Sequence, residues 1–338
     1  MSGRLCFSDD STPGITRRRK GRYWQYFDAA GKRITDRDEI DRLNGIGLPP
    51  AYVDAWFCPK PNGHIQAVGW DEKGRKQYRY HPDFREKREA VKYDRLRDFA
   101  RALPKLRRRV QADLRRRKLT RETVIAAVVK LLDTGCIRVG NEAYARDNKS
   151  YGATTLRSRH ATVSGRTVKM RFKAKSGKER ELSITDATLS RIVKRCQDLP
   201  GQHLFQYVNG DGEPQPVGST DVNDYIRAAT GDDFTAKHFR TWSASVIAFE
   251  QVCEADGEGV GLKAMIAPVA EILGNTPAIA RKSYVHPALV EAVKGRRGKG
   301  LAGLKCPRAT KYLSSAERGL AAFLAKTGRR TSRTSSNE

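Results

Sequence analysis

Short runs of apolar and aromatic residues, separated by polar turn residues, occupy the chain from Arg22 to Tyr80. Three of these runs, at 23–27, 63–70 and 77–80, have the composition of β-strands. The segments 28–32 and 71–75 between them contain Asp, Gly and Lys, which is typical of turns. A helix is expected near 36–43. The pattern predicts a small β-rich domain with some helix.

The hydrophobic period changes near Phe84, where apolar residues begin to recur every three or four positions. This spacing places them on one face of a helix. The residues that carry the pattern are Leu96, Phe99, Leu103, Leu106, Val110 and Leu114. Pro104 interrupts the stretch, so we expect a kink or two helices. A second helix is predicted from Thr120, a suitable N-cap, to Gly135.

The second half of the chain predicts a three-stranded β meander followed by helices. The strands lie at 161–163, 167–172 and 181–184, and the turns at 164–165 and 175–178. Helices are expected at 186–197, 220–229, 236–254, 263–273, 277–284 and 287–294. Residues 1–16 are expected to be loosely ordered, and 329–338, rich in Ser, Thr and Arg, to be disordered.

These patterns predict an α+β protein with four parts. Residues 1–20 form a flexible N-terminus and 21–90 a β-rich N-terminal domain. Residues 91–300 form a larger, mainly helical domain that carries the meander. A C-terminal extension spans 301–338.

The chain is strongly basic, with 65 Lys and Arg against 38 Asp and Glu and a formal charge of +27. Such an excess calls for an anionic partner, and nucleic acid is the leading candidate. No apolar run approaches the roughly 20 residues of a membrane span. The N-terminus lacks the apolar segment of a signal peptide, so we expect a cytoplasmic protein that does not contact a membrane.

The six cysteines and six histidines indicate no metal site. The cysteines are scattered and form no CxxC pair, and the histidines form no HExxH motif. We therefore expect free thiols rather than disulfides. We expect chemistry that needs no metal and no other cofactor.

Four residues in order along the chain, Arg138, Lys175, Arg240 and Tyr284, suit metal-free attack on a phosphodiester. The transition state of that reaction gathers negative charge on the non-bridging oxygens, and the planar fork of arginine binds two oxygens at once. Nearby positive charge helps a tyrosine, whose usual pKa is about 10, to lose its proton. A lysine can protonate the leaving oxygen.

Five stretches resemble one family, the type IB DNA topoisomerases of the poxvirus and bacterial branch. They are KGRKQYRY (73–80), LLDTGCIRVG (131–140), FKAKSGK (172–178), KHFRTW (237–242) and GNTPAIARKSY (274–284). The resemblance runs from about Lys20 to Val293. It implies a bacterial enzyme that closes two domains as a C-shaped clamp around double-stranded DNA. It also implies a monomer that acts at the nucleoid without ATP or another nucleotide cofactor.

The resemblance assigns a role to each residue of the set. Tyr284 attacks the scissile phosphate and forms a 3′-phosphotyrosine. Arg138 and Arg240 hold the non-bridging oxygens, and Lys175 is the general acid toward the 5′ oxygen. Asn275 donates a further hydrogen bond where the wider family often has His. Because Asn cannot titrate, its role here is electrostatic.

Further residues are expected to contact DNA. The resemblance places Gln77, Tyr78 and Tyr80 at the DNA surface and Tyr144 near a backbone phosphate. Lys178 and Lys237 are also expected to bind DNA. Three alternatives stay open. Tyr78 and Tyr80 can instead pack the sheet, Lys178 can replace Lys175 as the acid, and the arginine runs 107–109 and 115–117 form either a phosphate-binding stripe or a solvated helix face.

Two other functions compete with the topoisomerase. A tyrosine recombinase or integrase uses the same chemistry for strand exchange, but usually carries His-x-x-Arg at the second arginine, where this chain has Lys237. Recombinases also generally have a helical domain in place of a β-rich one. A non-enzymatic DNA-binding module explains the charge but not the ordered Arg, Lys, Arg, Tyr set.

Overall fold

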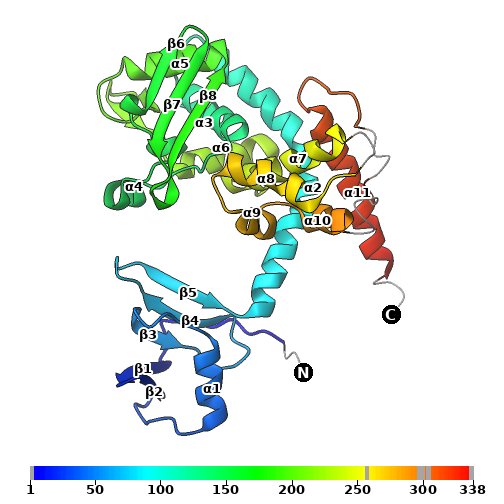
Figure 1. Cartoon of the computed structure of the whole chain (residues 1–338). Coiled ribbons are helices and arrows are strands. Elements are labelled where there is room, and N and C mark those ends of the chain that lie inside the picture. The colour runs from blue at the N-terminus through cyan, green and yellow to red at the C-terminus, as the bar shows by residue number, and fades with distance from the viewer. Residues whose placement is uncertain (1–3, 256–258, 295–300, 302–305, 335–338) are drawn as a thin grey trace. The chain divides into compact units, whose positions relative to one another are not determined.

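The computed structural model describes residues 4–255, 259–294, 301 and 306–334, and the chain divides into two compact units (Figure 1). The first unit spans Met1–Lys92 and the second Tyr93–Glu338. The first contains an antiparallel sheet, and the second is mostly helical with a small sheet of its own. This confirms the predicted α+β class.

The first unit is built on a five-stranded antiparallel sheet with the order β2-β1-β3-β4-β5. Its strands are β1 (Ile15–Lys20), β2 (Tyr23–Phe27), β3 (Val53–Phe57), β4 (Ile65–Trp70) and β5 (Lys76–Tyr80). Helix α1 (Arg37–Gly45) begins at Asp36, whose carboxylate accepts the backbone N–H of Glu39. The core contains Ile15, Tyr26 and Phe57. Strands β1 and β3 were not predicted.

Ten helices are described from Pro82 onward. They are α2 (Pro82–Leu114), α3 (Arg121–Gly135), α4 (Glu142–Asn148), α5 (Ala187–Gln197), α6 (Ser219–Thr230), α7 (Ala236–Glu254), α8 (Leu262–Leu273), α9 (Pro277–Ser283), α10 (Pro287–Lys294) and α11 (Ser315–Thr334). Helix α3 is buried on every side from Thr123 to Val129 and contacts α5, α6 and α7, so it lies at the centre of this unit.

A three-stranded antiparallel meander completes the second unit. It consists of β6 (Ala161–Ser164), β7 (Thr167–Lys173) and β8 (Glu179–Thr185), as predicted. Shorter elements are the 3-10 turns η1 (Ala153–Thr155), η2 (Ser158–His160) and η3 (Lys175–Gly177) and the hairpin of β9 (Gln206–Val208) with β10 (Pro214–Pro216). In Figure 1 the meander lies at one end of this unit and α11 at the other.

Helix α2 continues through Pro104, so the predicted alternative of two helices is wrong. Leu103 and Leu106, on either side of the proline, are completely buried in the core. Their packing holds the helix together although Pro104 removes one backbone hydrogen bond.

Two further predictions need correction. Cys253 and Cys306, expected to be free thiols, form a disulfide with their Cα atoms 6.0 Å apart. Their separation of 53 residues gives no sign of the pairing, because only the tertiary fold brings them together.

Residues from Arg329 were expected to be disordered, but α11 continues to Thr334. Residues 335–338 lie outside the described part of the chain.

Candidate active site

Arg138 follows the central helix on a segment held by backbone hydrogen bonds. Helix α3 ends at Gly135, and its C-cap Cys136 adopts the left-handed conformation with φ 51°. The carbonyl of Arg138 then accepts the N–H of Ala153 at 2.9 Å. Gly152 permits this close approach, because a Cβ atom there would lie 2.6 Å from the Arg138 carbonyl oxygen. The backbone of Arg138 is thereby fixed next to the core.

Arg240 lies one turn into α7 and is only 5% exposed. Its guanidinium donates to the carbonyls of Cys136 and Leu273. The Nε atom has no hydrogen-bond partner among the described residues. Burial lowers the pKa of Arg240, and the neighbouring charge of Arg138 lowers it further. Arg240 forms no ion pair with a carboxylate of the described residues, so its charge is not neutralised by an acid.

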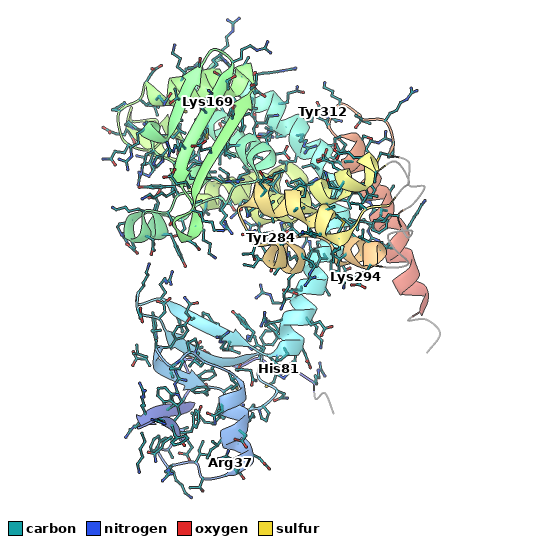
Figure 2. The ribbon with its side chains drawn as sticks, viewed as in Figure 1. Arg37, His81, Lys169, Tyr284, Lys294 and Tyr312 are labelled. Carbon is teal, nitrogen blue, oxygen red and sulfur yellow. A yellow bond between two sulfur atoms is a disulfide. The ribbon has the colours of Figure 1, made fainter. Side chains whose placement is uncertain are left out.

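Tyr284, labelled in Figure 2, is the C-cap residue of helix α9. It lies beside both arginines. The Nη2 atom of Arg138 lies 3.4 Å from its hydroxyl oxygen. The Arg240 guanidinium carbon lies 5.2 Å from the centre of its ring. Burial would raise the pKa of Tyr284, but the charges of Arg240 and then Arg138 outweigh it, so the pKa is lowered. This environment favours the phenolate, which is the stronger nucleophile.

Lys175 is exposed at the turn between β7 and β8. The turn depends on Ser176 and Gly177, whose φ values of 65° and 71° lie in the left-handed region. Lys175 lines a pocket of about 150 Å³ together with Arg138 and Arg240. Lys178 and Arg180 line the same pocket. The fold therefore gathers five cations around one small cavity, from the segment after α3, from α7 and from the hairpin, and Glu179 and Glu271 line the cavity too.

Asn275 follows Gly274, which also lines the pocket, but Asn275 itself does not. Its backbone N–H bonds the carbonyl of Ala270 at 2.9 Å. Its side-chain Nδ2 atom is buried and has no hydrogen-bond partner among the described residues. Asn275 therefore stays a predicted phosphate contact.

Three of the expected DNA contacts lie on β5 in the first unit. Gln77 donates to the carboxylate of Asp71 at 3.0 Å. The rings of Tyr78 and Tyr80 stack with their centres 5.9 Å apart, and Tyr80 also packs on Phe84. Tyr78 remains 40% exposed. Tyr80 thus packs within its unit, whereas Tyr78 also offers a free surface.

The other expected contacts lie in the second unit. Tyr144 on α4 is 43% exposed, and Lys237 on α7 is exposed. The Nζ atom of Lys178 lies 3.1 Å from the carbonyl oxygen of Gly274, so Lys178 is engaged inside the site. Tyr144 and Lys237 remain predicted phosphate contacts.

Arg180 is the site residue that we did not predict. The strand β8 alternates between exposed and half-buried residues, and Arg180 shares the inner face with Leu182 and Ile184. Extending the predicted strand 181–184 back by one residue places Arg180 on the face of these apolar side chains. The alternation of exposed and apolar residues along the strand could therefore have indicated that Arg180 points inward.

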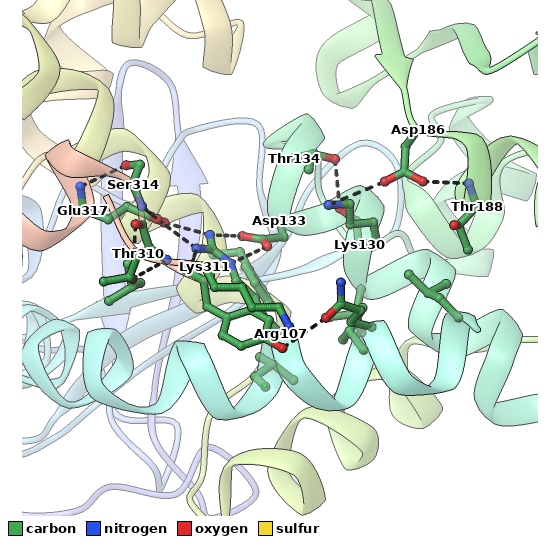
Figure 3. A pocket seen from close by; sticks show the side chains of 18 of the residues that line it. Arg107, Lys130, Asp133, Thr134, Asp186, Thr188, Thr310, Lys311, Ser314 and Glu317 are labelled. Atoms are coloured by element: carbon green, nitrogen blue, oxygen red, sulfur yellow. Dashed lines mark hydrogen bonds and ion pairs between the residues drawn. The ribbon is translucent and has the colours of Figure 1, made fainter. Parts of the chain in front are cut away.

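A larger pocket, of about 510 Å³, lies elsewhere in the second unit and is lined by part of the arginine runs (Figure 3). There Arg107 binds the carboxylates of Asp133 and Glu317, with closest contacts of 2.8 and 2.7 Å. Arg109 and Arg116 both pair with Asp113. Half of the six arginines therefore have carboxylate partners, which argues against a phosphate-binding stripe and leaves them in structural ion pairs.

The described residues contain no cluster of three or more His, Cys, Asp or Glu side chains that could hold a metal. None of the described helices is long and apolar enough to cross a membrane.

Two family models match the chain. Residues 81–297 match the catalytic core of eukaryotic DNA topoisomerase I, and residues 23–71 match the N-terminal domain of bacterial DNA topoisomerase IB. The chain is 33% identical over 286 residues to DNA topoisomerase 1B of Acanthamoeba polyphaga mimivirus, covering 80% of this chain and 85% of the relative. It is 23% identical to DNA topoisomerase I of Monkeypox virus, covering 68% and 72%.

Proposed function

The chain belongs to the type IB DNA topoisomerase family, and from this premise we propose that it relaxes supercoiled DNA through a covalent bond to Tyr284. The observation that carries the proposal is the position of the Tyr284 hydroxyl, 3.4 Å from Arg138 and beside the buried Arg240. Neither arginine is neutralised by a carboxylate within the described residues. A scissile phosphate supplies the missing negative charge.

In the cleavage step, the Tyr284 oxygen forms a bond to phosphorus and the bond from phosphorus to the 5′ oxygen breaks. The phenol proton leaves to water, and the Lys175 ammonium group gives a proton to the 5′ oxygen. Arg138 and Arg240 bind the non-bridging oxygens as their charge grows, and Asn275 donates one more hydrogen bond. The product is a 3′-phosphotyrosine with a free 5′ hydroxyl.

Resealing reverses these bonds. The free 5′ end rotates around the intact strand and releases supercoils, and its hydroxyl then attacks the phosphotyrosine and restores Tyr284. The covalent intermediate conserves the bond energy, so neither ATP nor a metal ion is required. We further propose that the two domains close around duplex DNA as a C-shaped clamp and that a monomer does this at the bacterial nucleoid.

The direct test is relaxation of positively and negatively supercoiled plasmid with EDTA present and ATP absent. We expect complete relaxation by the natural protein and none by Tyr284→Phe. An absolute requirement for magnesium or ATP in cleavage would contradict the proposal.

The strand-exchange alternative has less support. The position of the recombinase histidine is occupied by the exposed Lys237. The next residue, His238, packs between Phe99 and Phe234, and burial lowers its pKa. His238 therefore lies among aromatic side chains rather than at the phosphate. Joining of two different duplexes into recombinant products would favour this alternative.

A further inference from the structure

Helix α8 ends in a row of carbonyl groups that face the cations of the pocket. Gly274, with φ 64°, caps the helix, and its N–H bonds the carbonyls of Ala270 and Glu271. The last three carbonyls, those of Ile272, Leu273 and Gly274, each accept a hydrogen bond from a different cationic side chain. Arg180 Nη2 donates to Ile272, Arg240 Nη2 to Leu273 at 3.3 Å, and Lys178 Nζ to Gly274 at 3.1 Å.

The acceptors of these three cationic side chains are backbone carbonyls, which carry no net charge, rather than carboxylates. The C-terminus of a helix bears a partial negative charge that attracts Lys and Arg. In the described part of the chain, no carboxylate forms an ion pair with Arg138, Lys175, Lys178, Arg180 or Arg240. Glu179 and Glu271 also line the pocket, but neither forms an ion pair with these cations, and Glu179 pairs with Arg171 instead. The helix end thus gathers cations without pairing them with acids, which leaves charge for a phosphate.

Lys178 and Arg180 belong to the same hairpin as Lys175, three and five residues further along the chain. Arg180 pairs with Phe172 across β7 and β8 and lies half-buried in the pocket. Lys175 itself is exposed at the tip, and no hydrogen bond to its side chain is found among the described residues. The position of Lys175 therefore depends on how the hairpin is held.

We propose that Lys178 and Arg180 are positioning residues that fasten the β7–β8 hairpin to the C-terminal end of α8. They thereby hold Lys175 at the 5′ oxygen of the phosphate that Arg138 and Arg240 bind. This inference rests on the proposed function. It replaces the expected DNA contact of Lys178 with an anchoring role, and it gives Arg180 a role through Lys175.

The test compares two DNA substrates in single-turnover cleavage. One has an ordinary scissile phosphodiester, and the other has a 5′-bridging phosphorothiolate, whose sulfur leaves without a proton. Lys175→Ala is expected to cleave the ordinary substrate about 10² to 10⁴-fold more slowly and the phosphorothiolate at nearly the natural rate. Arg180→Met and Lys178→Met should show the same pattern with a smaller loss, about tenfold or more.

Two controls separate positioning from general damage to the fold. Arg171→Met changes another arginine of the hairpin, which is exposed and pairs only with glutamates of β8, so both substrates should be cleaved normally. The double variant Lys175→Ala/Arg180→Met should cleave the ordinary substrate no more slowly than Lys175→Ala. If Arg180→Met does not fold, Arg180→Lys takes its place, with a milder loss expected on the ordinary substrate alone.

Several results would overturn the inference. If Arg180→Met cleaves both substrates equally slowly, Arg180 either contacts the phosphate itself or is needed for the stability of the fold. If Arg180→Met cleaves both substrates at the natural rate, Arg180 has no role in cleavage. Full rescue of Lys178→Met without rescue of Lys175→Ala would make Lys178 the acid. If Lys175→Ala is not rescued and no variant is, the general-acid part of the proposed function fails, independently of Arg180.

Discussion

The second unit contains two clusters of arginine, one in which carboxylates neutralise the guanidinium and one in which they do not. In the Arg107 cluster (Arg107, Asp133 and Glu317), two carboxylates bind one guanidinium (Figure 3). Burial would lower the pKa of Arg107, but hydrogen bonds to Asp133 and Glu317 outweigh it and raise the pKa. In the active site, Arg240 donates to two backbone carbonyls and contacts Tyr284, but it has no carboxylate partner among the described residues, and burial lowers its pKa.

This difference shows how a structural arginine can be told from one that awaits a phosphate. Arg107 is half-buried on α2 and Arg240 is buried on α7, so a position on a core helix does not separate them. The presence of carboxylate partners does separate them, because a guanidinium that is already paired with acids gains little binding energy from a DNA phosphate. The Arg107 cluster connects α11 with α7, because Glu317 also accepts the indole N–H of Trp242 at 3.1 Å. Changes in the two clusters should therefore have opposite consequences for chemistry and stability.

The largest effect is expected at Tyr284. Tyr284→Phe should abolish cleavage of a suicide duplex, because it removes the attacking oxygen. DNA binding should stay close to normal, because affinity comes mainly from many phosphate contacts. Gel-shift titration at fixed salt measures the binding. Residual cleavage by this variant would assign the nucleophile elsewhere.

Lysine in place of either active-site arginine should be nearly as harmful as alanine. Arg138→Lys and Arg240→Lys keep the charge but lose the planar fork that spans two oxygens, so we expect cleavage to slow by roughly 10²-fold or more. Single-turnover rates of the Lys and Ala variants at both positions provide the measurement. Near-natural rates for the Lys variants would show that a point charge suffices.

The Arg107 cluster should respond in stability rather than in chemistry. Arg107→Met leaves Asp133 and Glu317 without their cation, and we expect it to lower the free energy of unfolding by about 3 kcal/mol. Cleavage by the folded variant should stay near the natural rate. Urea unfolding measures the expected loss of stability, and single-turnover cleavage at low temperature measures the expected retention of activity. A large loss of cleavage with unchanged stability would reverse the distinction between the clusters.

The smallest effect is a pH dependence at Glu317. Burial would raise its pKa, but Arg107 outweighs burial, so the pKa lies below the ordinary value of 4.5. A lowered carboxyl pKa stabilises the fold above the ordinary value, and that contribution is lost as pH falls through the folded-state pKa. Glu317→Gln should cost about 2 kcal/mol at neutral pH. Its deficit against the natural protein should shrink as pH falls below 4.5 and through the folded-state pKa of Glu317. Urea unfolding across pH measures this change, and a constant deficit would contradict the assignment.

Periodicity predicted most of the second unit because its elements are regular and strongly amphipathic. The meander and the helices that carry Arg240 and Tyr284 were found in this way. Strand β1 was missed because Arg17, Arg18 and Arg19 interrupt any alternation. Helix α11 was missed although its buried residues Ala316, Leu320 and Leu324 recur every four positions. Helix α2 was misjudged at Pro104, where the packing of Leu103 and Leu106 decides the outcome.

The candidate site shows the same limit. The order of Arg138, Lys175, Arg240 and Tyr284 was visible in the sequence. The bonds of Lys178 and Arg180 to α8 were not, because they join residues more than 90 positions apart. Nor does sequence distinguish Arg107, with its distant partner Glu317, from an arginine that binds DNA.

The most direct test of this account is to locate the covalent bond between protein and DNA. The protein is trapped on a suicide duplex, digested with protease, and the peptide that carries the nucleotide is sequenced by mass spectrometry. We expect a phosphodiester on Tyr284, beside the two arginines that have no carboxylate partner among the described residues. An adduct on Tyr225, which is bonded to Asp113, on Tyr312, or on any other residue would contradict it.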